Sequence, residues 1–322
     1  MCLESLVGQE EISQQGIAFE IIVVDDHSTD RTREIASSFP QVKVIDAGPL
    51  PQGWTGKANA VTCGAREARG AWLLFTDADT VHKPGSLARA MNEAKQLGVD
   101  LLSYSPEQEV LSFVERSVMP VIFAELATRY KPSEVSDPKS NAAAANGQYI
   151  LVSREAYDSV GGHGAIAGSL LEDVELARAV KRSGRKIFFR LAADQVRTRM
   201  YRTTTQLIEG WSKNLVLLFP HPVQLACLRA AEFTTIWASG LLALALLWRG
   251  QVALAALAAA LCATLKIFLL RRILHAHFSW NSNLLAIFGL PIFAYLLLRS
   301  VIQYKRGRVA WKGRNYSGTA PS

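Results

Sequence analysis

Ala71-Trp-Leu-Leu-Phe-Thr-Asp-Ala-Asp79 is an apolar run that ends in two carboxylates one residue apart. A continuous apolar run of this kind is typical of a strand inside a sheet, and open α/β sheets bind ligands beyond the carboxyl ends of such strands. Two fixed negative charges at that place need a cation. Because Mg²⁺ and Mn²⁺ prefer one or two carboxylates with phosphate oxygens and waters, Asp77 and Asp79 predict a site for a metal ion and a diphosphate.

A second acidic cluster follows another apolar strand upstream. Glu20-Ile-Ile-Val-Val24 is that strand, and Asp25-Asp-His-Ser-Thr-Asp30 comes directly after it. A carboxylate at such a strand end can accept hydrogen bonds from a base N–H or from ribose hydroxyls. The same residues also suit an Asx-turn or a helix N-cap, so by themselves Asp25 and Asp26 leave both interpretations open.

Strand and helix signals alternate along residues 1–219. This alternation indicates βαβ units and an α/β fold with a mostly parallel sheet. Strands are predicted at 19–24, 42–45, 71–76, 100–105, 148–152 and 186–190, and helices at 2–15, 30–39, 57–69, 85–97, 107–130 and 172–183, with a loop at 131–146.

The C-terminal third has a different composition. Charges are scarce from 225 to 302, and three apolar stretches at 231–248, 252–270 and 284–302 are each near the ~20 residues that span a hydrocarbon core. The chain carries a net charge of +7, but its basic groups flank these stretches, as they do in cytoplasmic loops near anionic lipids. With no DNA- or RNA-binding motif, we expect a membrane and no nucleic acid as partner.

The basic tail raises a question of topology. If 1–219 is cytoplasmic and all three stretches cross, the tail lies outside, against the positive-inside bias. Gly289-Leu-Pro291 interrupts the third stretch, so a re-entrant segment is the alternative. The N-terminus lacks the features of a cleaved signal peptide, so we expect the first part in the cytoplasm. The predicted parts are an α/β domain at 1–219, transmembrane or re-entrant helices at 220–303 of an inner membrane, and a basic cytoplasmic tail at 304–322.

Lys57 and the pair Glu172-Asp173 carry charge at predicted helix starts. Lys57 follows a loop and opens a helix, where its ammonium and the helix N-terminus both favour a phosphate. A carboxylate at 172–173 can take the proton of an attacking hydroxyl as a general base. Each also has an ordinary interpretation, because lysines are usually solvated and helix starts favour acidic residues.

An aromatic residue and two histidines are less informative. Trp211 lies just before the apolar region and fits either an interfacial anchor or a wall of the catalytic cleft. His163 is predicted as a surface or loop residue, whereas His82 stands out because it lies three residues after Asp79.

Four ordered motifs together resemble the family 2 glycosyltransferases of GT-A fold. They are Val23-Val-Asp-Asp-His-Ser-Thr-Asp-Arg-Thr32, Gly56-Lys-Ala-Asn-Ala60, Thr76-Asp-Ala-Asp-Thr80 and Leu171-Glu-Asp-Val-Glu175. Gly53-Trp-Thr-Gly-Lys57, Gly210-Trp-Ser-Lys-Asn214 and Trp311-Lys-Gly-Arg-Asn-Tyr316 are similar to membrane members that glycosylate lipids, such as hopanoid- and carotenoid-associated enzymes and, more distantly, ceramide glucosyltransferases. The resemblance implies a Rossmann-like, mostly parallel sheet with helices on both faces, followed by a helical membrane region.

The resemblance also implies roles in binding the donor. Asp26, with Asp25 beside it, would contact the uracil of a UDP-sugar. Lys57 would face the diphosphate, and Asn59 of the same motif counts among the substrate-binding residues. The stretch Asn146-Gly147-Gln148 matches the part of the family that lines the sugar or acceptor pocket.

The remaining implied roles concern the metal and the chemistry. Asp79 would coordinate Mn²⁺ or Mg²⁺ with support from Asp77, and Asp173 would be the catalytic base, positioned by Glu172. Trp211 falls where processive members carry Gln-x-x-Arg-Trp, but the arginine is absent here, which favours transfer of a single sugar.

The family normally begins with a strand and a Pro-x-x-Asn-Glu-like loop, whereas this chain begins inside the following helix. We therefore expect the chain as written to be poorly stable or inactive, and a longer form to work. The function implied is metal-dependent, inverting transfer of one sugar from a nucleotide-sugar to a membrane lipid. The alternatives are a polyprenyl-phosphate glycosyltransferase and an inactive, truncated nucleotide-binding membrane protein.

Overall fold

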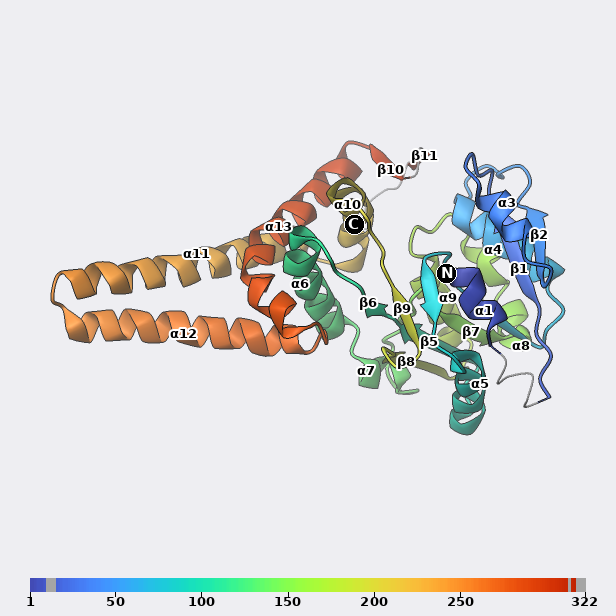
Figure 1. The fold of residues 1–322 in the computed structure, drawn as a ribbon, viewed down its shortest axis with the longest axis horizontal. Coiled ribbons are helices and arrows are strands. Elements are labelled where there is room, and N and C mark those ends of the chain that lie inside the picture. The colour runs from blue at the N-terminus through green and yellow to red at the C-terminus, as the bar shows by residue number, and fades with distance from the viewer. Residues whose placement is uncertain (10–15, 312–313, 317–322) are drawn as a thin grey trace. The chain divides into compact units, whose positions relative to one another are not determined.

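The computed structural model describes residues 1–9, 16–311 and 314–316. These divide into two compact units (Figure 1). The first unit contains residues 1–109 and 130–199, and the second contains 110–129 and the chain from 200 onward. The predicted boundary at 219 therefore falls inside the second unit, which also takes one helix from the middle of the sequence.

Three sheets form the first unit. The largest has the strand order β3 (Trp72–Phe75), β7 (Ile150–Ser153), β5 (Leu101–Ser105), β8 (Ile187–Leu191). A parallel pair consists of β1 (Ile21–Asp25) and β2 (Val42–Asp46), and a small sheet has the order β4 (Thr80–His82), β9 (Val196–Thr198), β6 (Glu107–Gln108).

The α/β class is confirmed, and the strand pairing is more mixed than simple alternation predicts. β5 and β8 are parallel, but β7 runs antiparallel to both of its neighbours. The chain leaves this unit after β6 and returns at Tyr130 before it forms β7, so β5 and β7 are not joined by a simple βαβ crossover.

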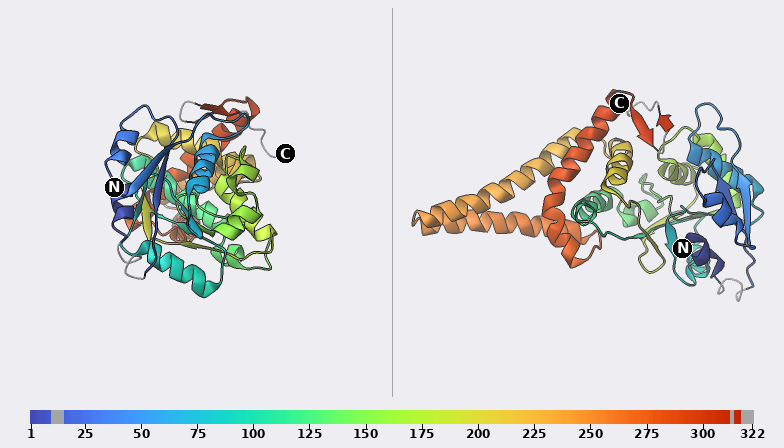
Figure 2. Two further views of the ribbon diagram at one scale, coloured as in Figure 1. Left: turned by 90° about the vertical axis from the view of Figure 1, so that its right-hand side faces the viewer. Right: turned by 45° about the horizontal axis from the view of Figure 1, so that its top comes forward.

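Helices cover both faces of the four-stranded sheet, as predicted (Figure 2). Leu101 and Leu102 of β5 belong to two different apolar cores because successive side chains of a strand point to opposite faces. The first core includes residues from α8 (Arg154–Ser159) and α9 (Glu172–Arg182), and the second includes the buried face of α5 (Ser86–Leu97). The other helices of this unit are α1 (Cys2–Val7), α3 (Thr32–Ser37), α4 (Gly56–Glu67), α7 (Pro132–Ser136) and the 3-10 helix η1 (Gly162–Ile166).

Two predicted boundaries were wrong. The helix predicted at 107–130 begins only at Phe113, because Glu107 and Gln108 pair with β9 as strand β6. Its start is fixed by a capping box in which Ser112 Oγ accepts a hydrogen bond from Glu115 N, and Glu115 Oε2 accepts one from Ser112 N. The loop predicted at 131–146 contains the short helix α7. The helix predicted at 2–15 begins at Cys2 as α1 but ends at Val7, with Gly8 as its C-cap, and residues 10–15 lie outside the described part.

The second unit is helical. It contains α6 (Phe113–Arg129), α10 (Thr204–Leu218), α11 (Pro222–Trp248), α12 (Val252–Leu274) and α13 (Trp280–Lys305), followed by strands β10 (Val309–Trp311) and β11 (Arg314–Tyr316). Within the described chain, α11, α12 and α13 are long and apolar enough to cross a membrane.

The expected interruption at Gly289-Leu-Pro291 does not occur. Helix α13 runs without a break from Trp280 to Lys305, with Pro291 inside it. A proline removes one backbone donor, and neighbouring helices can offset that loss. The Gly289-Leu-Pro291 motif therefore does not end the helix, and Gly289 instead affects how α13 packs against its neighbour α6.

Candidate active site

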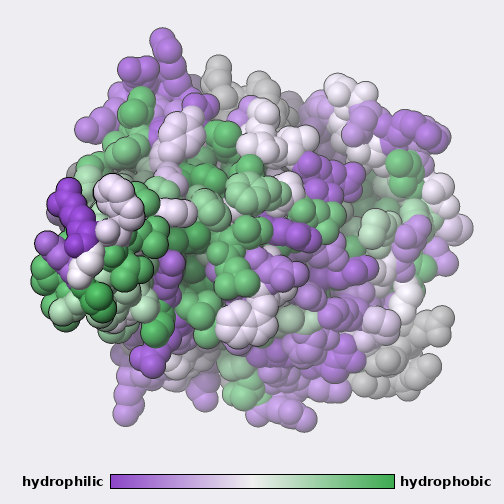
Figure 3. Space-filling view, turned by 60° about the vertical axis from the view of Figure 1, so that its left-hand side comes forward, coloured by the Kyte–Doolittle hydropathy of each residue, from purple (hydrophilic) through white to green (hydrophobic). Residues whose placement is uncertain are grey.

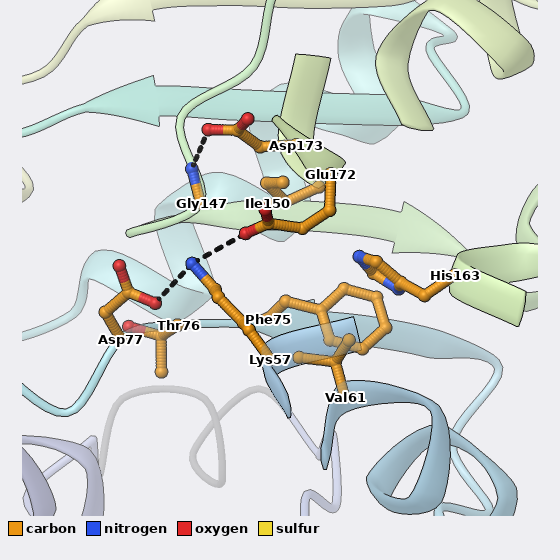
Figure 4. A pocket seen from close by; sticks show the side chains of 10 residues that line it. All are labelled: Lys57, Val61, Phe75, Thr76, Asp77, Gly147, Ile150, His163, Glu172 and Asp173. Carbon is orange, nitrogen blue, oxygen red and sulfur yellow. Dashed lines mark hydrogen bonds and ion pairs between the residues drawn. The ribbon is translucent and has the colours of Figure 1, made fainter. Parts of the chain in front are cut away.

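Lys57, Asp77 and Glu172 form the centre of a charged cluster in the first unit (Figure 4). Lys57 Nζ lies 2.8 Å from Asp77 Oδ1 and 2.9 Å from Glu172 Oε1. Burial opposes the charge of Lys57, but Asp77, Glu172 and Asp173 outweigh it and raise the pKa of Lys57 well above its ordinary value. Three carboxylates thus surround one ammonium, and the cluster keeps a negative excess.

Local structure brings these side chains together from three elements. Lys57 is in the first turn of α4, where Thr55 Oγ1 caps the helix by accepting a hydrogen bond from Ala58 N. Asp77 follows the carboxyl end of β3, and Glu172 is the first residue of α9. The sequence motifs at 57, 77 and 172 therefore meet at one place. Such a meeting is what we expect if all three residues belong to one functional site.

Asp173 is held in place by backbone donors. Its Oδ2 accepts a hydrogen bond from Gly147 N at 3.0 Å, and its Oδ1 accepts one from Val174 N at 2.8 Å. Burial, and next the charge of Glu172, raise the pKa of Asp173 to about 6, against the lowering effects of Lys57 and the two hydrogen bonds. A carboxylate with a pKa near the working pH suits a general base.

Gly147 allows the close approach of Lys57 and Asp173. A Cβ at this position would lie 2.8 Å from Lys57 Nζ and 3.6 Å from Asp173 Oδ2. Because real Cβ atoms almost never approach another heavy atom within 3.0 Å, any side chain here would displace the ammonium. Gly147 thus touches the cluster directly.

The two neighbours of Gly147 brace the loop. Asn146 Oδ1 accepts a hydrogen bond from Gln148 N, and Asn146 N donates one to Ser103 Oγ. Gln148 is buried, and its backbone carbonyl accepts a hydrogen bond from Thr76 Oγ1 at 2.9 Å. Asn146 and Gln148 therefore fix the position of Gly147 relative to the end of β3.

Asp77 and Asp79 lie in one tight turn between β3 and β4. Thr80 N donates a hydrogen bond to Asp77 O, and Thr198 Oγ1 donates one to Asp79 O, each at 3.1 Å. The carboxylate of Asp79 is exposed, whereas that of Asp77 meets Lys57.

The donor set of this turn fits a hard divalent cation, because it offers carboxylate oxygens in a negative environment. Nowhere in the described residues do three or more His, Cys, Asp or Glu side chains form a group that could hold a metal by themselves. A metal at Asp77 and Asp79 would therefore take further ligands from substrate phosphates and water, as Mg²⁺ usually does.

Asp25 and Asp26 differ in their surroundings. Asp25 is buried, its Oδ1 accepts a hydrogen bond from Ser28 N, and its Oδ2 lies 3.4 Å from Arg33. The hydrogen bond from Ser28, more than the charge of Arg33, lowers the pKa of Asp25. Asp26 is partly exposed beside His27, which has a left-handed backbone (φ 59°) that is uncommon for a non-glycine residue. Asp25 thus closes the turn, and Asp26 is the more accessible carboxylate.

Asn59 and Trp211 have clear packing partners. Asn59 is buried and donates a hydrogen bond from Nδ2 to Ala47 O, which ties α4 to the loop after β2. Trp211 belongs to the second unit, where its indole N–H points to Met119 Sδ at 3.3 Å and its ring packs edge-on against Phe123. Their predicted contacts with substrate stay predictions.

His163 was not identified from the sequence as a residue of the site. It was predicted as a surface or loop residue, but it is only 2 % exposed, and burial lowers its pKa to about 4. Its Nδ1 lies 3.0 Å from the Tyr157 hydroxyl, which also accepts a hydrogen bond from His163 N, and its ring packs edge-on against Phe75. The imidazole points toward Glu172 and Lys57 (Figure 4). The one sequence signal was Gly161-Gly162 before it, two glycines that both adopt positive φ.

His82, the last residue of β4, is also buried. Its Nε2 lies 3.1 Å from Thr76 Oγ1, directly behind the Asp77 turn, and burial lowers its pKa to about 4. Its sequence position near Asp79 was therefore a correct indication of its neighbourhood.

A small pocket of about 20 Å³ lies among the residues of the charged cluster. That volume holds one water molecule and no sugar ring. The residues that line it are Lys57, Val61, Phe75, Thr76, Asp77, Gly147, Ile150, His163, Glu172 and Asp173.

Comparison with known proteins identifies the class. The sequence model of glycosyl transferase family 2 matches residues 1–161, half of the chain. The chain belongs to this family and is a glycosyltransferase. The family resemblance seen in the sequence motifs is thereby confirmed.

Three individual proteins that the chain resembles share less than a third of the aligned residues with it. The 4,4'-diaponeurosporenoate glycosyltransferase of Staphylococcus aureus (strain USA300) is 27 % identical over 320 residues, which cover 95 % of this chain and 83 % of that protein. Among solved structures, S. aureus TarS matches with a TM-score of 0.44 and 17 % identity, over 69 % of this chain and 37 % of the longer TarS chain. Glucosyl-3-phosphoglycerate synthase of Mycobacterium tuberculosis matches with a TM-score of 0.41 and 18 % identity, over 67 % of this chain and 73 % of that one.

Proposed function

We propose that this glycosyltransferase transfers a single sugar from a UDP-sugar to a membrane lipid, with inversion at the anomeric carbon. The observation that carries the proposal is Asp173, whose pKa of about 6 and fixed orientation suit a base that accepts a proton near neutral pH. The acceptor hydroxyl would lose its proton to Asp173 as it attacks the anomeric carbon, and UDP would leave from the opposite face.

The other charged residues would prepare this step. Lys57 keeps Glu172 and Asp77 in position and favours the ionised form of Asp173. Asp79 and Asp77 would hold Mg²⁺ or Mn²⁺, which when bound supplies positive charge that stabilises the departing diphosphate. Asp26 is the accessible carboxylate that would contact the base of the donor.

The lipid acceptor is supported by two facts. The protein named 4,4'-diaponeurosporenoate glycosyltransferase aligns with nearly the whole of this chain, including its apolar C-terminal part. Three helices of the described chain could cross a membrane, and a lipid acceptor is held in such an environment. A cytoplasmic first unit would then meet the acceptor at the inner leaflet.

A labelled-sugar assay tests the proposal. Membranes that contain the full chain would be incubated with a panel of radiolabelled UDP-sugars, Mn²⁺ and total membrane lipids, and the labelled lipid identified. We expect one labelled lipid, and its loss in Asp173→Asn but not in Glu175→Gln, a carboxylate on the same helix that pairs with Arg178.

Two results would contradict it. Label on a polyprenyl phosphate that persists in Asp173→Asn would indicate a phosphate acceptor, which needs no strong base. No label on any lipid, together with UDP affinity that does not respond to metal, would indicate a non-catalytic membrane protein.

A further inference from the structure

The three apolar helices of the second unit differ in how much protein covers them. In their most apolar windows, 11 % of residues are buried in α11 and 17 % in α12, but 44 % in α13. Helices α11 and α12 lie side by side as a hairpin (Figure 1). Large apolar residues are exposed on this hairpin, among them Leu241, Leu244, Leu254 and Leu257. Hydrophobic residues gather over this part of the surface (Figure 3). Such surface needs a lipid environment.

The N-terminal half of α13 packs against α6. A Cβ on Gly289 would lie 1.9 Å from Ser117 O, so the backbones of the two helices are in direct contact. α6 carries Glu115, Arg116, Glu125 and Arg129 within its 17 residues. Because charged side chains are costly in hydrocarbon, α6 is unsuited to cross the membrane, and the half of α13 that packs against it therefore has a charged helix as its neighbour.

The C-terminal half of α13 is held by α10. Ser300 Oγ accepts a hydrogen bond from Val216 N at 3.0 Å, and the Tyr304 hydroxyl donates one to Lys213 O at 2.9 Å. α10 also contains charged residues, Glu209 and Lys213. Both halves of α13 therefore adjoin helices that carry charge (Figure 2).

One face of α13 remains exposed along its whole length, and it is apolar. Its large members recur at intervals of three, four and seven residues, which places them on one side of a helix. They are Trp280, Leu284, Phe288, Tyr295, Leu298 and Ile302, named here the α13 stripe. A helix with a continuous apolar stripe on one side and protein on the other can lie in the membrane–water interface.

A buried ion-pair cluster marks the base of the α11–α12 hairpin. Glu125 of α6 lies 2.9 Å from Arg229 of α11, and Glu232 of α11 lies 2.6 Å from Arg229 and 2.8 Å from Arg272 of α12. Beyond these charges, α11 has no charged residue from 233 to 248 and α12 has none from 252 to 265. Lys266 follows this stretch of α12, and its long side chain can extend so that its ammonium lies near the membrane–water interface, beside the ion-pair cluster.

We propose that α11 and α12 cross the membrane as a two-span hairpin, and that α13 does not cross but lies in the interface with the α13 stripe against the acyl chains. The chain before Pro222, the α12–α13 connection and the basic residues after α13 are then on one side, and Arg249 at the hairpin tip is on the other. Arg271, Arg272, Lys305, Arg306 and Arg308 all lie on the same side, as the positive-inside bias favours. This topology is independent of which sugar and acceptor the enzyme uses.

Cysteine labelling tests the topology. In a full chain whose four native cysteines are replaced by serine or alanine, single cysteines would be placed as Arg249→Cys, His275→Cys and Arg306→Cys. A membrane-impermeant maleimide would be applied to intact cells and to inverted vesicles. We expect Arg249→Cys to react from one face, and His275→Cys and Arg306→Cys to react only from the other.

Either of two results overturns the proposal. Arg306→Cys labelled from the same face as Arg249→Cys would mean that α13 crosses, and Arg249→Cys labelled from the face of His275→Cys would mean that the hairpin does not. Sugar transfer measured on the same variants separates this question from the proposed function, because an active enzyme can still show the wrong labelling pattern.

A measurement of depth in the membrane gives a second test with a different set of cysteine variants, for use where a labelling variant does not fold. Leu284→Cys, Tyr295→Cys and Ile302→Cys would carry a fluorophore whose quenching by lipids labelled at known depths reports its position. An interfacial α13 gives the same shallow depth at all three sites. A crossing helix gives a deep central site and shallow ends, which contradicts the proposal.

Discussion

Lys57 Nζ lies 2.8 Å from Asp77 Oδ1, so the lysine predicted to face a diphosphate contacts the carboxylate predicted to support a metal. A second contact to Glu172 makes this lysine the link between the end of β3 and the start of α9. The ammonium offsets part of the repulsion among the carboxylates that surround it. Its role in binding a diphosphate stays a prediction, and its role as a counter-charge follows from the distances.

We expect Lys57→Met to lower kcat/KM by at least ~10²-fold and to move the acidic limb of the pH–rate profile to higher pH. Lys57 lowers the pKa of Asp173, so its removal raises that pKa and leaves less of the base ionised at a given pH. The measurement is the pH dependence of sugar transfer. Lys43→Met is the control, because Lys43 forms an exposed ion pair with Glu67 in the same unit. An unchanged acidic limb in Lys57→Met would exclude this role.

The wild-type rate should fall as the pH drops below about 6, because Asp173 acts as a base only when ionised. The same raised pKa affects stability with the opposite sign. Since the folded-state pKa lies above the unfolded one, ionisation of Asp173 destabilises the fold as the pH rises through about 6. Asp173→Asn should therefore lose ~10²- to 10⁴-fold in rate. Its amide can accept only one of the two backbone hydrogen bonds that Asp173 accepts, so the readout is the pH dependence of the melting temperature and not its value at one pH. The wild type should lose stability relative to Asp173→Asn as the pH rises from about 4 to 8, and a difference between the two that is constant with pH would contradict the assignment.

The motifs could be predicted from sequence because each obeys a local rule. Asp77 ends an apolar strand and Glu172 begins an amphipathic helix, and both rules depend only on neighbours in the chain. Long apolar helices were predicted for the same reason. The convergence of Lys57 on Asp77 and Glu172 depends on how α4, β3 and α9 pack, which no local pattern shows.

His163 and the short strands could not be predicted. The imidazole is buried because Phe75 and Tyr157, distant from each other in sequence, enclose it. β4 and β9 contain three residues each, too few to show alternation, and they exist because they pair with each other. Gly289 was interpreted as a helix interruption, although its small size serves contact with α6.

Gly147→Ala should reduce activity by ~10-fold or more without unfolding the protein. The added methyl group would lie 2.8 Å from Lys57 Nζ, so the ammonium must shift and its short contacts with Asp77 and Glu172 change. A misplacement of about 1 Å in an active site can cost as much as 10²-fold in rate. Gly240→Ala is the matched control, because its new methyl group would have only an ordinary 3.5 Å contact with Cys262. Equal rates for both variants and the wild type would show that activity does not depend on the position of the Lys57 ammonium beside residue 147.

Tyr157→Phe should destabilise the protein by ~1–3 kcal/mol, measured by denaturant unfolding. The hydroxyl accepts a hydrogen bond from His163 N and contacts His163 Nδ1, and both groups are buried. Tyr295→Phe removes a hydroxyl with a single long contact of 3.5 Å to Arg299, and should change stability by much less. Similar losses in the two variants would mean that the Tyr157–His163 pair contributes nothing specific.

Asp79→Asn should weaken UDP binding in the presence of Mn²⁺ and leave binding in EDTA unchanged. The exposed residue Asp79 is the predicted metal ligand, so its loss should affect only the metal-linked part of the affinity. Isothermal titration of the full chain with UDP, with Mn²⁺ or with EDTA, measures both parts. Asp30→Asn is the control, because this exposed aspartate accepts its hydrogen bond from Thr32 N in the turn after β1. We expect at least a ~10-fold loss with Mn²⁺ for Asp79→Asn and none for Asp30→Asn. Wild-type binding that is the same with Mn²⁺ and with EDTA would remove the metal from the proposed mechanism.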